Sequence, residues 1–187
     1  MRTSLVYAQK FLNPLFCINR VKNFINQDTR KTLYYAMIHS HLTYCINIYS
    51  CANSTSLNKL RLKQKEAIRI ITNSGYRDHT SPLCAQLKIL SLDQLFKYNA
   101  LKFMHCYHHN ALPIAFHQMW LLNRERNPDR VLRNAGQLYV PPHHFATLKR
   151  MPLFNFPSLW NQEDNVKQNP IQHQYLKNLK SRCLAVV

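Results

Sequence analysis

Apolar residues recur at three- and four-residue steps along the first half of the chain, a spacing typical of helices with one buried side. The clearest case is residues 57–73, with Ser56 as the expected N-cap and Gly75 just beyond the end. The positions that share its apolar side are Leu57, Leu60, Gln64, Ala67, Ile68 and Ile71. We therefore predict an amphipathic helix over 57–73.

Residues 30–50 show similar spacing and predict an amphipathic helix of their own. Asp28 is the expected cap, because a carboxylate accepts hydrogen bonds from the free N–H groups of the first turn and suits the helix dipole. The positions that fall on one face are Leu33, Met37, His41, Cys45 and Ile48.

Helices are also predicted over 82–90 and 91–109. Ser81 and Pro82 have the pattern of an N-cap followed by proline at the first helical position. Ser91 and Gln94 have the spacing of a capping box. The broad apolar face of the second of these helices comprises Leu92, Leu95, Phe96, Phe103, Met104 and Tyr107. A further helical stretch is expected over 114–122.

Apolar periodicity fades after residue 123, where prolines interrupt the chain. We expect a short strand over 138–140 and a last helix over 171–184. The side chains expected to pack back on the helical core are Phe154, Phe156, Leu159 and Trp160. The predicted fold class is mostly α, with a helical domain over 1–122. An irregular, proline-containing segment with a terminal helix follows over 123–187.

Charge is the strongest compositional signal. Lys and Arg number 25 against 8 Asp and Glu, a formal net charge of +17, which attracts polyanions such as nucleic acid or, second, anionic membranes. Polar residues interrupt the most apolar long segment, 33–52, and argue against a membrane span. With no secretory signal and no C-x-x-C pair among six cysteines, we expect reduced thiols and an intracellular location, nuclear or cytoplasmic.

Catalytic signatures are weak in this sequence. Polymerases and nucleases hold divalent metals with clustered carboxylates, and the carboxylates here are scattered. The adjacent pair Glu163 and Asp164 is expected in a solvated turn. Two glycines are too few for Gly-rich phosphate loops, and no nucleophile motif is present. We predict no catalytic residue and no cofactor on this chain.

Histidine clusters invite a zinc hypothesis that their spacing does not support. His105, Cys106, His108, His109 and His117 lack the paired cysteine half of known zinc patterns. The loop pair His143 and His144 is no stronger. We expect surface and interface histidines and no metal site.

The polar side of the 57–73 helix is the best candidate for function, because lysines and arginines on one side of a packed helix can follow a phosphate backbone without reading bases. The predicted nucleic-acid-binding residues are Lys59, Arg61, Lys63, Lys65 and Arg69, extended by Arg77, Arg30 and Lys31. The competing interpretation is a solvated surface that keeps the protein soluble. Four tyrosines have two possible roles: stacking on bases or sugars, or semi-buried packing with the hydroxyl in contact with water. They are Tyr34, Tyr35, Tyr44 and Tyr49.

An ordered series of short motifs covers nearly the whole chain from Phe11 onward. It opens with the run Leu33–Cys45 and continues with Leu57-x-x-Leu60, Gln64-Lys65, Ala67-Ile68-Arg69 and Ile71. It goes on through His79-Thr80-x-Pro82-Leu83, Leu87-x-Ile89-Leu90, Lys102-Phe103-Met104, Asn110-x-Leu112-Pro113, Arg133, 138–141, Phe154-Asn155-Phe156-Pro157 and Leu159-Trp160-Asn161. This series resembles the C-terminal region of jockey-like non-LTR retrotransposon reverse transcriptases.

The resemblance implies a region downstream of the catalytic palm, corresponding to the thumb and C-terminal linker, that grips an RNA–DNA or DNA duplex. The palm's paired aspartates are absent, so the family's RNA-directed DNA polymerase activity is not expected on this chain. The expected function is sequence-independent nucleic-acid binding, with the missing palm and fingers as a further partner and no membrane. The alternatives are a piece of a longer polymerase, a protein-interaction module and a non-functional remnant.

Overall fold

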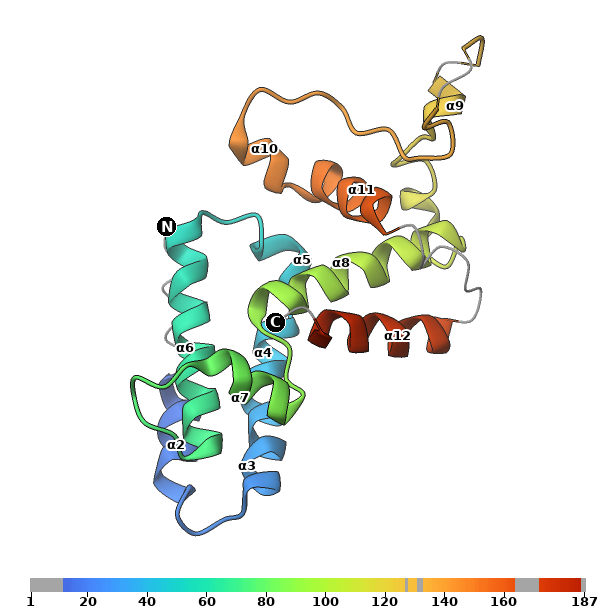
Figure 1. Ribbon diagram of the computed structural model, residues 1–187. Coiled ribbons are helices and arrows are strands. Elements are labelled where there is room, and N and C mark those ends of the chain that lie inside the picture. The colour runs from blue at the N-terminus through green and yellow to red at the C-terminus, as the bar shows by residue number, and fades with distance from the viewer. Residues whose placement is uncertain (1–11, 127, 131–132, 164–171, 186–187) are drawn as a thin grey trace. The chain divides into compact units, whose positions relative to one another are not determined.

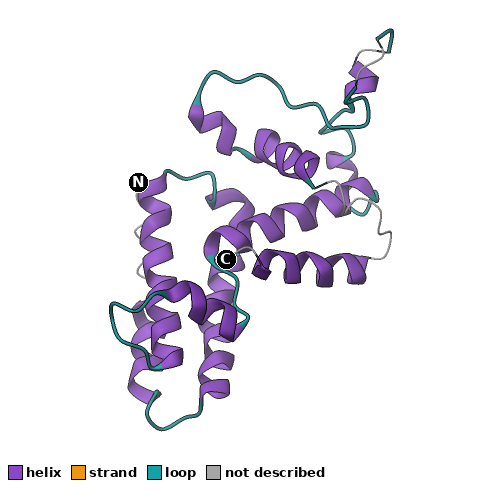
Figure 2. Cartoon of the chain, in the orientation of Figure 1, coloured by secondary structure: helices purple, strands orange, loops and turns teal. Residues whose placement is uncertain are grey.

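The computed structural model describes residues 12–126, 128–130, 133–163 and 172–185, and its regular elements are helices (Figures 1 and 2). The mostly α fold class is confirmed. The predicted strand over 138–140 is wrong: in the described residues, Leu138 forms only an isolated antiparallel bridge with Leu122. Pro141 and Pro142 follow directly and have no N–H to donate to a neighbouring strand.

The chain divides into two compact units. Among the described residues, unit 1 comprises 12–46, 52–95 and 184–185, and unit 2 comprises 47–51 and most of 96–183. This division falls inside the long helix α8 (Leu92–His108), whose first turn belongs to unit 1. The boundary expected after residue 122 stays a prediction.

Unit 1 is built around helix α6 (Ser54–Thr72), which packs against α2 (Leu12–Val21), α3 (Gln27–Tyr34) and α7 (Thr80–Leu87). Its most deeply buried side chains include Ile18, Tyr34, Ile38, Leu42, Ile68, Ile71 and Ile89. The predicted buried side of α6 is confirmed at Leu60, Gln64, Ala67, Ile68 and Ile71, while Leu57 is half-buried.

The ends of α6 differ from the predicted ones. Asn53 is the N-cap in place of Ser56, and its side-chain oxygen accepts a hydrogen bond from the Ser56 N–H at 3.0 Å. Asn73 ends the helix in the left-handed conformation (φ 54°) in place of Gly75. Asparagine suits both positions, because its short amide caps free N–H groups and tolerates positive φ.

The predicted continuous helix over 30–50 is wrong. α3 begins after Asn26, whose side chain accepts from the Thr29 N–H at 2.8 Å, so Asn26 and not Asp28 is the cap. The chain then forms a π-helical turn, η1 (Tyr35–His39), and a short α4 (Ser40–Thr43). Cys45 has a left-handed backbone (φ 53°) and separates α4 from α5 (Ile46–Tyr49).

The buried face of this segment is also rotated by about one residue from the expected one. The buried positions are Tyr34, Ile38, Leu42 and Ile46, whereas His41, Cys45 and Ile48 are exposed. The offset is already present at Tyr34, before η1 begins, so the π-turn is not its cause. Apolar residues occur on both faces here, so packing against α6 decided which face is buried.

The buried Gln64 connects three parts of unit 1. Its side-chain amide donates to the Leu90 carbonyl at 2.8 Å and to the Tyr34 hydroxyl at 3.1 Å. An amide group buried at 4% exposure is tolerated because these partners satisfy its N–H donors. Burial raises the pKa of Tyr34 above the ordinary tyrosine value, and the hydrogen bond from Gln64 only partly offsets this.

Tyr34→Phe is expected to make stability less sensitive to alkaline pH. The folded state holds the Tyr34 proton more tightly than the unfolded chain does, so wild-type stability is fully present below about pH 10 and falls above it, by up to about 1.4 kcal/mol per pH unit from this group. Phenylalanine removes that contribution. Urea unfolding followed by circular dichroism from neutral pH to pH 11 measures both slopes, with Tyr76→Phe as the exposed control. Equal slopes for wild type and Tyr34→Phe would contradict the prediction.

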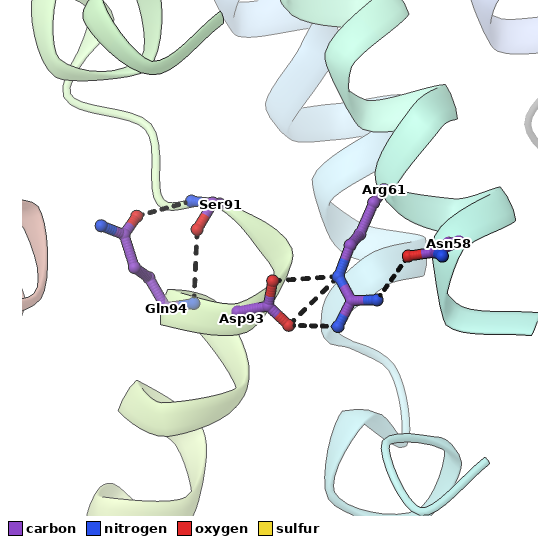
Figure 3. A network of polar contacts seen from close by, with 5 residues as sticks. All are labelled: Asn58, Arg61, Ser91, Asp93 and Gln94. Atoms are coloured by element: carbon purple, nitrogen blue, oxygen red, sulfur yellow. Dashed lines mark hydrogen bonds and ion pairs between the residues drawn. The ribbon is translucent and has the colours of Figure 1, made fainter. Parts of the chain in front are cut away.

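The N-terminal end of α7 differs from the prediction, whereas the N-terminal end of α8 agrees with it. α7 begins after His79, so Pro82 is its third residue and Ser81 is not the cap. It ends earlier than expected, at Leu87, and Lys88 follows as a left-handed C-cap. The capping box is confirmed: Ser91 N–H donates to the Gln94 side-chain oxygen at 2.9 Å, and Gln94 N–H donates to the Ser91 hydroxyl at 3.4 Å (Figure 3).

Unit 2 contains most of α8 and five later elements of the described chain. These are the 3-10 turn η2 (Ile114–Phe116), α9 (Asn123–Arg126), α10 (Ala146–Arg150), α11 (Pro152–Gln162) and α12 (Gln172–Ala185). The helix expected over 114–122 is thus limited to η2. The predicted last helix is confirmed within its described residues, while Ile171 lies outside them.

Helix α11 shows that the described part of the segment after residue 123 is more regular than predicted. Pro157 lies inside it and has no N–H, which leaves the carbonyl of Leu153, four residues earlier, without its helical donor. The indole N–H of Trp120 donates to that carbonyl at 2.9 Å. A side chain distant in sequence therefore compensates for the proline.

Aromatic residues form the core of unit 2. Phe156 is 2% exposed, and its ring centroid lies 5.6 Å from Phe103, 6.2 Å from Phe96 and 6.4 Å from Trp120. Trp160 is buried as well, with the His108 ring stacked on it. The expected packing is confirmed for Phe156 and Trp160.

Glu163 is buried rather than solvated, so the predicted turn role is wrong for this residue, while Asp164 lies outside the described residues. Its two carboxylate oxygens pair with Lys97 of α8 and Arg182 of α12, each at 2.7 Å. Cations from two helices distant in sequence converge on it. The residues next to Glu163 in the sequence therefore do not reveal these two partners.

Candidate nucleic-acid interface

The five predicted basic residues of α6 form two rows. Four-residue steps bring Arg61, Lys65 and Arg69 into one row, and Lys59 and Lys63 into another. The same helical geometry places the exposed Leu62 and the acidic Glu66 between them. The polar side of α6 is therefore not uniformly positive.

Arg61 forms an ion pair with Asp93 in the first turn of α8. Its guanidinium forms two hydrogen bonds with separate Asp93 oxygens, at 2.6 and 2.9 Å, and a third bond with Asn58 at 2.8 Å (Figure 3). The hydrogen bond to Asp93 raises the pKa of Arg61. Asp93 in the first turn of α8 also suits the helix dipole. Most of Arg61's donor capacity is thus used in joining α6 to α8.

Lys65 is exposed, and no carboxylate of the described chain lies within ion-pair distance of it. It borders an open hollow of about 230 Å³ between α6, α7 and the start of α8. Thr80, Ser81 and Ser91 are among the residues that line the same hollow. Lys65 also lowers the pKa of Cys84, although burial of that thiol raises it more.

Arg69 lies at the end of the first row beside an exposed turn. It donates two hydrogen bonds, at 3.0 and 3.1 Å, to the Asp78 carbonyl. Its guanidinium carbon lies 5.9 Å from the centroid of the Tyr76 ring. Arg77, the next residue, is exposed. Tyr76 was not among the predicted binding residues, although a tyrosine between Gly75 and Arg77 in a polar loop was a usable signal.

The second row is partly neutralised. Lys63 pairs with Glu66 at 2.8 Å, and both side chains are partly exposed, so water screens the pair. Lys59 is exposed, with no ion pair to any residue that the structure describes. Lys59 is therefore the available cation of this row.

Arg30 and Lys31 lie on α3 and are half-buried. A terminal nitrogen of Arg30 is 3.4 Å from the Ile70 carbonyl, one of the last carbonyls of α6. A cation at a helix C-terminus is favourable for the dipole, so Arg30 stabilises the end of α6. Contact of either residue with phosphate stays a prediction.

Of the histidines of the zinc hypothesis, one is buried and three are exposed, namely His105 against His108, His109 and His117. The ring centroids of His105 and His109 are 4.3 Å apart. The His117 Nε2 forms a hydrogen bond with the Leu112 carbonyl oxygen at 2.9 Å. The described residues contain no group of three or more side chains able to hold a metal ion. Of the four tyrosines proposed for stacking, Tyr34 is buried and Tyr44, at 66% exposure, is the most accessible.

Fold and site together define a mostly helical protein that carries cations along one helix and an adjoining turn. Comparison with protein-family models, with curated proteins and with solved structures finds no match for this chain. None of the described helices is both long and apolar enough to span a bilayer.

Proposed function

We propose that this chain is a non-catalytic module that binds nucleic acid through phosphates, independently of base sequence. The observation that carries the proposal is the exposure of Lys59, Lys65 and Arg77 in unit 1, where no carboxylate of the described chain pairs with them. Such cations can replace phosphate counterions without breaking an internal ion pair. The net charge of +17 adds long-range attraction.

The motif series that begins at Leu33–Cys45 supports a more specific proposal. In this proposal the chain corresponds to the thumb and linker of a non-LTR retrotransposon reverse transcriptase, and the duplex is an RNA–DNA hybrid or DNA. The palm and fingers of such a polymerase are a proposed partner, and an intracellular location, nuclear or cytoplasmic, follows from the same proposal. Polymerase chemistry is not proposed, since the sequence has no paired aspartates.

Reversing the three available charges is expected to weaken duplex binding. The variant Lys59→Glu, Lys65→Glu, Arg77→Glu should bind roughly 10- to 100-fold more weakly, and the log–log salt slope should fall by about 0.9 for each phosphate that the protein no longer neutralises. Fluorescence anisotropy of a labelled RNA–DNA hybrid duplex at several salt concentrations measures both. Circular dichroism checks that helicity is unchanged.

The matched control reverses three exposed lysines of unit 2, Lys102, Lys177 and Lys180. It removes the same total charge from another surface. If both triple variants weaken binding equally, net charge and not this interface is responsible. If wild-type protein, shown to be folded, binds no duplex at low salt, the proposed function is wrong. That result would favour the alternative that the chain is a protein-interaction module.

A further inference from the structure

Tyr76 is a large aromatic residue of unit 1 whose side chain is exposed to solvent. It is 87% exposed, in the loop between α6 and α7. The Asp78 N–H donates to the Gly75 carbonyl at 3.2 Å, so Tyr76 and Arg77 are the two central residues of a hydrogen-bonded β-turn. Both side chains are exposed at these central positions.

Several interactions fix this turn. The Gly75 N–H donates to the Asp78 carboxylate at 2.7 Å, and a Cβ at Gly75 would come within 3.3 Å of that carboxylate. A side chain at position 75 would therefore require the Asp78 carboxylate to shift slightly. The two bonds from Arg69 hold the Asp78 carbonyl, and the Ser74 N–H donates to the Arg69 carbonyl at 3.0 Å. A fixed turn reduces the entropy lost when a ligand binds to it.

The surroundings of the ring are cationic. The Arg69 guanidinium is within cation–π distance of the Tyr76 ring, and the high exposure of Tyr76 leaves ring surface open to a ligand. Arg77 is exposed next to it in the chain, and the carboxylate of the following residue, Asp78, accepts a hydrogen bond from the Gly75 N–H. An exposed aromatic ring among arginines is the combination by which proteins bind single-stranded nucleic acid.

We propose that Tyr76 stacks on an unpaired nucleobase while Arg77 and Arg69 contact the adjoining phosphates. The ligand class is a single strand, or the single-stranded part next to a duplex. Bases inside a duplex are already stacked on their neighbours, so only an unpaired base offers its face to the ring. This inference rests on the proposed function and adds to it a preference for unpaired nucleotides.

The test compares two probes on the full chain: a blunt RNA–DNA hybrid duplex and a short single strand that contains 2-aminopurine, whose fluorescence is quenched on stacking. Tyr76→Ala is expected to bind the single strand roughly 5- to 150-fold more weakly, the contribution of one stacked base, and to lose the quenching. Its affinity for the blunt duplex should stay close to that of wild type.

Two further variants separate stacking from a general effect. Tyr76→Trp keeps an aromatic face and should restore both affinity and quenching. Phe24→Ala is the matched control, because Phe24 is 88% exposed in the same unit but lies in the loop between α2 and α3. It should bind the single strand like wild type.

The outcomes distinguish this inference from the proposed function. Wild-type quenching and single-strand affinity in Tyr76→Ala, with duplex binding intact, would overturn stacking and leave the proposed function standing. Equal weakening on both probes would overturn the preference for unpaired bases. If wild type binds neither probe, both proposals fail.

Discussion

Replacing Lys97 and Arg182 together by methionine is expected to lower the free energy of unfolding by about 3 kcal/mol, the lower end for a buried charge that loses its partners. The carboxylate of Glu163 is 9% exposed, so without these cations it would be desolvated and uncompensated. The two cations are 41% and 47% exposed, and water screens part of their attraction, which favours the lower end.

Tryptophan fluorescence during urea unfolding is a suitable measurement, because both tryptophans, Trp120 and Trp160, lie in unit 2. Adding Glu163→Gln to the double variant should recover much of the loss, since a neutral amide has a smaller desolvation cost than a lone carboxylate. Lys177→Met with Lys180→Met on the same helix, both exposed, is the charge-matched control. A double variant as stable as this control would show that Glu163 does not depend on its partners.

Phe156→Ala is expected to destabilise the protein by about 3–5 kcal/mol, the range for truncating a fully buried phenylalanine. The loss has two parts: the transfer free energy of the ring and the cavity left among Phe96, Phe103 and Trp120, whose rings contact it. The corresponding fall in Tm is roughly 6–20 °C for a chain of this size.

Thermal unfolding followed by tryptophan fluorescence measures this effect. Leu153→Ala is the control on the same helix, since its side chain is 39% exposed and its carbonyl still accepts from Trp120. That variant should lower the free energy of unfolding much less than Phe156→Ala does. Similar losses for the two variants would show that Phe156 is not the centre of the unit 2 core.

Local patterns predicted the elements that depend on near neighbours in sequence. Helix α6 and its buried side follow from apolar spacing within the helix. The capping box of Ser91 and Gln94 joins residues three apart, so the pattern and the structure agree. Gln64 was correctly assigned to the apolar side, although the pattern did not reveal its partners.

Elements that depend on distant partners were missed. Pro157 suggested an interruption, and α11 continues because Trp120, 33 residues from Leu153, donates to the freed carbonyl. The buried face of residues 30–50 was misassigned because apolar residues occur on both faces, and packing within unit 1 decides which face is buried. Glu163 was expected in water because its partners lie far along the chain.

The sequence by itself determined that this protein is mostly helical and strongly basic, because apolar spacing and charge count need no knowledge of distant contacts. It also identified the cations of α6 as a group. The tertiary structure alone decided which of them are available, by bringing Asp93, 32 residues away, onto Arg61 while leaving Lys59 and Lys65 in water. The physical reason is that ion pairing and desolvation depend on distance in space, which folding sets.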